Sequence, residues 1–88
     1  NLRLKALHHL GKSFFKRGIT DLALQPILTA IQEKEVFDDQ KKELLYDLGL
    51  IHDQLGNQEE AMEQFKLIYG LDITYKDVAD RVETYYLQ

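Results

Sequence analysis

Two glycines interrupt a helical pattern in the middle of the chain, and they constrain the fold more than any other feature. In residues 47–65, DLGLIHDQLGNQEEAMEQF, apolar residues recur at intervals of three, four and seven, the period of an amphipathic helix. Gly49 lies inside this pattern, where glycine costs roughly 1 kcal/mol relative to alanine. Gly56 follows at a position typical of a helix end. We therefore expect each glycine to have a structural role.

The same pattern occurs twice. When the chain is slid along itself so that Gly11 falls on Gly49, Gly18 falls on Gly56 and Ile27 falls on Phe65. A second shift, which brings Leu48 onto Val82, carries the pattern into the end of the chain, where Glu83 takes the place of the first glycine. We interpret the shared residues as structural positions of a repeated two-helix unit: Leu10, Gly11, Gly18, Ala23, Leu48, Gly49, Gly56, Ala61 and Phe65.

Five helices and no strands are predicted, because no segment alternates with period two for long enough. We expect helices over residues 2–17, from Thr20 and Asp21, from Asp38 and Asp39, from Asn57 to near Gly70, and from Thr74 with Asp77. Asn57 and Glu60 have the spacing of a capping box. Pro26 lies inside the second helix, which predicts a kink or a later helix start.

The segments LYDLGLIHDQLGNQEEAMEQF and LHHLGKSFFKRGITDLALQPI resemble the tetratricopeptide repeat, a helix–turn–helix unit of about 34 residues. The resemblance implies an all-α, right-handed superhelix in one domain, 1–88, with repeats at about 4–37 and 42–75 and a capping helix at about 74–88. The family's proline near the end of the second helix is absent, and the first repeat is longer than the standard unit, an excess that we place in EKEVFDD. Because no paired helix follows the last one, Glu83 is expected to face water. The tail LDITYKDVADRVETYY is also similar to tails of bacterial members, and the start at Asn1 suggests a part of a longer array.

The first helices of successive repeats line a concave groove in this family, where peptides or partner helices bind. Phe15, Tyr46 and Leu50 would be the anchoring residues of such a groove, and Gly49 would form a packing notch against Ala61. The family's groove positions correspond here to Lys5, His8, Lys12, Phe15 and Lys16, then Glu43, Tyr46, Asp47, Leu50, Asp53 and Gln54, then Asp77, Asp80, Arg81 and Thr84. They form a basic end, an apolar and aromatic middle and an acidic end, or else a solvated face whose charges segregate by chance.

Other functional classes have weaker support. ALHHLGKS matches a permissive phosphate-binding loop, but it lies in a predicted helix without a preceding strand. His8 and His9 point about 100° apart on a helix and His52 takes a packing position, so we expect no metal site among the three histidines. The acidic pairs Asp38/Asp39 and Glu59/Glu60 begin helices, where they complement the helix dipole. No catalytic constellation or cofactor site is expected.

Composition limits the partners. The net charge of −4 argues against nucleic-acid binding, and no apolar run approaches the ~18 residues that span a bilayer. The chain has no cysteine, which is compatible with the cytosol without establishing it. Two functions remain open: a non-catalytic module that binds a protein or peptide in the groove, and a structural element that packs against other copies or upstream repeats. Regulatory packing against an enzyme domain elsewhere in a longer chain is a third.

Overall fold

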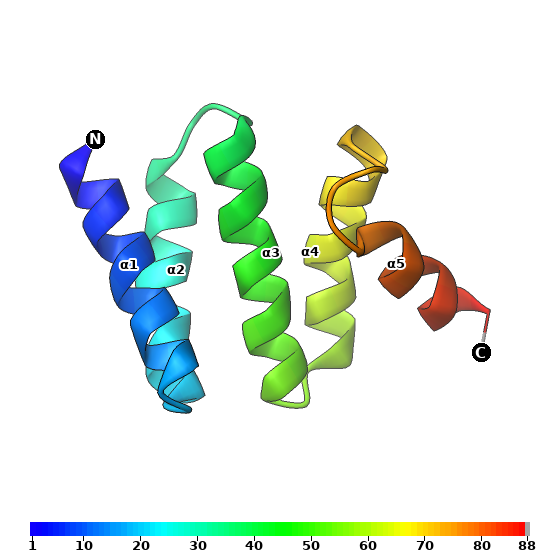
Figure 1. Ribbon diagram of the computed structural model, residues 1–88, viewed down its shortest axis with the longest axis horizontal. Helices are drawn as coiled ribbons and strands as arrows, with labels where there is room; N and C mark the ends of the chain where they lie inside the picture. The colour runs from blue at the N-terminus through cyan, green and yellow to red at the C-terminus, as the bar shows by residue number, and fades with distance from the viewer. Residues whose placement is uncertain (88) are drawn as a thin grey trace.

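The computed structural model describes residues 1–87 and contains five helices arranged one after another (Figure 1). They are α1 (Leu2–Lys16), α2 (Thr20–Glu33), α3 (Asp39–Gln54), α4 (Gln58–Leu71) and α5 (Val78–Tyr86). Each helix packs against the next, and the first four stand side by side with α5 inclined at the C-terminal end. No strand occurs in this part of the chain, which confirms the all-α prediction. None of its helices has the length and hydropathy needed to cross a bilayer.

The paired helices are joined by the same kind of turn. Gly18 and Gly56 have φ of +78° and +84°, a conformation that glycine adopts without steric cost. In the first turn Ile19 N–H donates to Phe14 C=O over 2.9 Å, and in the second Asn57 N–H donates to His52 C=O over 2.8 Å. The predicted turn role of both glycines is therefore confirmed.

The glycines inside α1 and α3 lie where paired helices approach most closely. A Cβ on Gly49 would come within 2.5 Å of Phe65 Cε1, and a Cβ on Gly11 would clash with the end of the Ile27 side chain. Ile27 and Phe65 are separated by the same interval as the two glycines, so the internal repeat holds at this contact. The atoms nearest to the missing Cβ of Gly49 belong to the Phe65 ring, and Ala61, the partner predicted from the sequence, is buried in the same cluster.

Two buried clusters form the core, and α3 contributes to both. The cluster between α1, α2 and α3 consists of Leu4, Ala23, Ile27, Ala30, Leu44, Leu48 and Ile51. The cluster between α3, α4 and α5 consists of Leu45, Tyr46, Ala61, Met62, Phe65, Ile68, Val78 and Val82. Successive apolar residues of α3 thus face opposite neighbours, because the helix is covered on two sides.

Leu10 departs from its predicted structural position. The equivalent Leu48 is only 3% exposed because it packs into the cluster with α2, whereas Leu10 is 44% exposed. No helix in the described part of the chain lies on the outer side of α1. Leu10 therefore occupies the same repeat position as the buried Leu48, but no neighbouring helix covers it in the described part of the chain.

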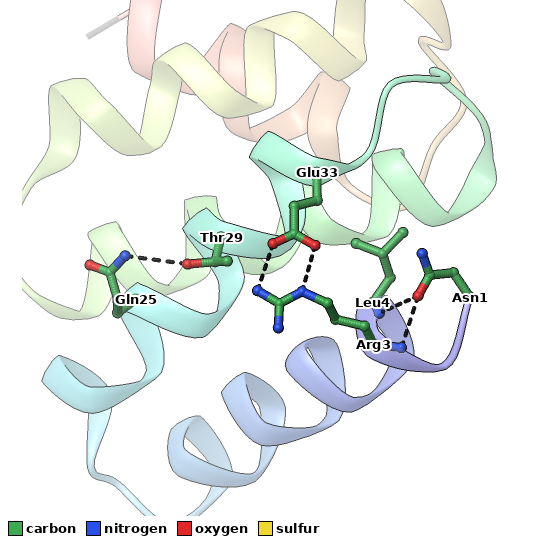
Figure 2. A network of polar contacts seen from close by, with 6 residues as sticks. All are labelled: Asn1, Arg3, Leu4, Gln25, Thr29 and Glu33. Atoms are coloured by element: carbon green, nitrogen blue, oxygen red, sulfur yellow. Dashed lines mark hydrogen bonds and ion pairs between the residues drawn. The ribbon is translucent and has the colours of Figure 1, made fainter.

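Charged and polar contacts also join α1 to α2. The Arg3 guanidinium donates two hydrogen bonds of 2.8 Å to the Glu33 carboxylate, and the Asn1 side chain caps α1 by accepting from Arg3 N–H and Leu4 N–H (Figure 2). Figure 2 also shows Gln25 and Thr29 in contact along α2. The first helix is thus fixed at its N-terminal end.

α2 begins at Thr20 and α4 begins after Asn57, as predicted, but one predicted helix start and two other details need correction. The Asn57 side chain caps nothing, because its amide lies 3.3 Å from His52 Nδ1 across the turn. α5 begins at Val78 rather than Thr74, because the Thr74 hydroxyl donates to Asp72 and Lys76 has a φ of +41° that a helix cannot contain. α2 continues through Pro26 from Thr20, so the later start is wrong. The prediction that Glu83 faces water is confirmed: it is exposed and accepts a hydrogen bond from Tyr69.

Candidate functional site

A pocket of about 230 Å³ lies between α1 and α3, with α2 beneath it. Its lining is mainly apolar, and two lysines of α1 contribute to it. The residues that line it are Gly11, Lys12, Phe15, Lys16, Ile27, Asp47, Leu50 and Ile51. Five of these, Lys12, Phe15, Lys16, Asp47 and Leu50, are among the groove residues expected from the sequence.

The pocket lies where α1 and α3 contact each other far less than each contacts α2. Ile27 of α2 packs under Gly11 and is fully buried, so it forms the floor. Phe15 and Leu50 are only partly buried, and they line the pocket from α1 and α3. Sequence reasoning did not identify Ile27 and Ile51 as pocket residues, because both have the spacing of ordinary core positions.

Beside the pocket, a polar cluster connects α1 to α3. His8 Nε2 lies 2.6 Å from Asp47 Oδ2 and 3.9 Å from Glu43 Oε1, and the Lys12 ammonium is paired with Glu43. The hydrogen bond from Lys12 lowers the pKa of Glu43, and the same bond raises the pKa of Lys12. The charges that were expected to segregate along the groove therefore partly neutralise each other between neighbouring helices.

His8 and Tyr46 are not on the open surface. His8 is 8% exposed and is directed at Asp47. The Tyr46 ring packs against Phe65 and Tyr75, and the Lys76 ammonium lies 4.8 Å above it. A partner would have to displace the segment before α5 to reach this ring.

The acidic end is also engaged within the protein. Asp77 accepts a hydrogen bond of 2.6 Å from the Tyr46 hydroxyl and one of 3.0 Å from Arg81 Nε. Burial opposes ionisation of Asp77, but these two hydrogen bonds outweigh it and lower its pKa. The Arg81 guanidinium covers the Phe65 ring at 5.1 Å. Arg81 therefore packs on the buried Phe65 ring and also binds Asp77 at the surface.

The remaining predicted residues are open to solvent. Lys5, Lys16, Asp53 and Asp80 are exposed, as are Gln54 and Thr84. Among the ion pairs of residues 1–87, none involves Lys5, Lys16, Asp53 or Asp80. Of these four, only Lys16 also lines the pocket, so it is the charge most directly available to a bound group.

Sequence reasoning missed the group of possible metal ligands, His8, Glu43 and Asp47. It compared the histidines with one another, whereas the structure brings His8 to two carboxylates on another helix. The available signal was the spacing of Glu43 and Asp47, which places both carboxylates on one face of α3. A comparison of the chain with family models, with curated proteins and with solved structures found no match.

Proposed function

We propose that the chain is a non-catalytic protein-interaction module of the tetratricopeptide-repeat type. In this proposal α1–α2 and α3–α4 are two repeats of a right-handed superhelix and α5 is the capping helix. The equivalent Gly turns support it, and so do the equivalent close contacts of Gly11 with Ile27 and of Gly49 with Phe65. The groove would be the surface on which α1 and α3 form the pocket.

The observation that carries the proposed binding function is the apolar pocket with an exposed lysine at its edge. Phe15 and Leu50 can contact an inserted apolar side chain while Ile27 closes the floor. Complete burial of a large apolar side chain contributes about 1.5–3 kcal/mol. Lys16 can pair with a carboxylate beside it. We therefore infer a peptide or helix that presents a large apolar residue next to an acidic one.

A displayed library of random peptides tests this proposal even though the partner is unidentified. Peptides enriched on the wild-type chain should share an apolar residue near Asp or Glu. Lys16→Glu should weaken their binding by roughly fivefold, corresponding to about 1 kcal/mol for a lost exposed ion pair. Lys66→Glu makes the same charge change on α4, away from the pocket, and should have little effect. Equal effects of the two substitutions would refute binding at this pocket.

The structural alternative is supported by a different observation. Leu10 is 44% exposed at one end of the helix row, and Tyr86 and Leu87 are 58% and 84% exposed at the other. A second copy or further repeats would cover these surfaces. Light scattering over a range of concentrations separates the two functions. A molar mass that increases with concentration in the wild type but not in Leu10→Ser would favour the structural function. A monomer at all concentrations would argue against self-association.

A further inference from the structure

Three potential metal ligands meet where α1 passes α3. The donor atoms of His8, Glu43 and Asp47 all lie within 4.8 Å of one another. Two of them are well shielded from solvent, since the His8 side chain is 10% exposed and the Asp47 side chain 16%. Glu43 and Asp47 come from successive turns of α3, so a single rigid helix holds both carboxylates.

We propose that His8, Glu43 and Asp47 bind a Zn²⁺ ion that links α1 directly to α3. One imidazole nitrogen and two carboxylate oxygens are ordinary zinc ligands, and a three-residue site leaves the fourth tetrahedral position to water. Magnesium and calcium fit less well, because these ions prefer six or more oxygen ligands. The proposal does not depend on the groove function.

Two of the three separations between ligand atoms can be compared with those of a tetrahedral site. Bonds of about 2.0–2.2 Å separate neighbouring ligand atoms by about 3.3–3.6 Å in a tetrahedral site. His8 Nε2 is 2.6 Å from Asp47 Oδ2, which is shorter, and 3.9 Å from Glu43 Oε1, which is longer. Both differ from the tetrahedral separation by about 1 Å or less, and the third separation, between the two carboxylates, is at most 4.8 Å. Rotation of the side chains would have to bring the three atoms to bonding positions.

Lys12 competes with the ion for Glu43. Its ammonium is paired with the Glu43 carboxylate, so an incoming ion must displace it. The Lys12 side chain is 40% exposed and can move into solvent. The proposal therefore predicts that removing the charge of Lys12 increases the affinity for zinc. If the cluster is only a set of ion pairs, the same change should leave the affinity for zinc unaltered.

A bound ion would add a connection that the helix packing supplies only weakly. α1 packs mainly on α2, and α3 packs mainly on α2 and α4, so the two helix pairs meet chiefly through α2 and α3. Asp47 also lines the pocket between α1 and α3. Zinc would thus fix one wall of this pocket relative to the other.

Calorimetric titration of the chain with ZnCl₂ tests the site, and visible absorption of a Co²⁺-loaded sample reports tetrahedral coordination. We expect one ion per chain, at least tenfold weaker binding in His8→Gln and Asp47→Asn, and severalfold tighter binding in Lys12→Gln. His9→Gln is the matched control, since His9 is the exposed neighbour of His8 on α1, and its affinity should equal that of the wild type.

Circular dichroism establishes that each variant is folded. Because His8→Gln can lose affinity through unfolding, the gain in folded Lys12→Gln is the decisive result. Unchanged affinity in Lys12→Gln, equal losses in His8→Gln and His9→Gln, or the absence of zinc binding by the wild type would each overturn the proposal.

Discussion

Gly49→Ala is the most informative single substitution, because it improves the helix propensity of α3 and at the same time creates a steric clash with α4. Alanine is the better helix former by about 1 kcal/mol in the middle of a helix. Its methyl group would, however, come within 2.5 Å of Phe65 Cε1 and 2.6 Å of Cζ, far inside normal contact distance. The sign of the net effect therefore depends on whether the Phe65 ring can move.

The structure holds that ring on several sides. Phe65 is fully buried, the Tyr46 ring packs on it at 5.6 Å, and the Arg81 guanidinium lies over it at 5.1 Å. Overpacking in such a site costs about 1–3 kcal/mol. Because a Cβ would meet two Phe65 ring carbons within 2.6 Å, we expect a cost in the upper part of this range, about 2–3 kcal/mol. After subtraction of the gain of about 1 kcal/mol in helix propensity, the free energy of unfolding should fall by about 1–2 kcal/mol. For a domain of this size the melting temperature would fall by roughly 4–16 °C.

Urea unfolding followed by circular dichroism measures the effect, and the chain contains its own control. Gly70→Ala makes the same change near the end of α4, where a Cβ would have no neighbour within 4 Å, so it should be neutral or stabilising by up to about 1 kcal/mol. Phe65→Leu should cost less in the Gly49→Ala background than in the wild type, because the smaller side chain relieves the clash. A Gly49→Ala protein as stable as the wild type would refute the close approach of α3 and α4.

Two further predictions concern burial. Burial raises the pKa of Tyr75 from 10.0 to about 12, and nearby carboxylates add to the shift. Because the folded state favours the protonated phenol, Tyr75 stabilises the fold fully below about pH 10. This contribution to the free energy of unfolding is lost as the pH rises through about 12. The stability difference between wild type and Tyr75→Phe, measured by urea unfolding at several alkaline pH values, should therefore change in this window and remain constant from neutral pH to about pH 9. Leu48→Ala should cost about 2–5 kcal/mol and Leu10→Ala less than about 1 kcal/mol, although both occupy the same repeat position; equal losses in thermal melting would contradict their different exposures.

Much of the fold follows from local sequence signals. Apolar periodicity and the turn glycines identify five helices, and the spacing of Gly11 and Gly49 identifies the positions of close approach. The partner of Gly49 could not be chosen in this way, because Ala61 and Phe65 lie on the same face of α4 and only the helix crossing decides which of them enters the notch. The start of α5 was misplaced because the Thr74 hydroxyl binds Asp72 instead of capping a helix.

The candidate site was less predictable than the fold. Five pocket residues were among the expected groove positions, since they share the face of α1 and α3 on which the groove was predicted. Whether a charged residue on that face is free or paired depends on the residue opposite, which the periodicity of one helix does not specify. For this reason Lys12 and Lys16, one helical turn apart, have different surroundings: Lys12 is paired with Glu43, while Lys16 is exposed.

The position of α3 in both buried clusters has a consequence for how the molecule loses its structure. The two helix pairs do not have separate cores, because both clusters include residues of α3. Leu44 and Leu48 belong to the cluster with α1 and α2, while Leu45 and Tyr46 belong to the cluster with α4 and α5. Unfolding of α3 would therefore disrupt both clusters in a single cooperative step, whereas opening of α1 or α5 would affect only one of the two clusters. Amide protons of α3 should accordingly exchange with solvent most slowly, and protection from exchange should decrease toward α1 and toward α5.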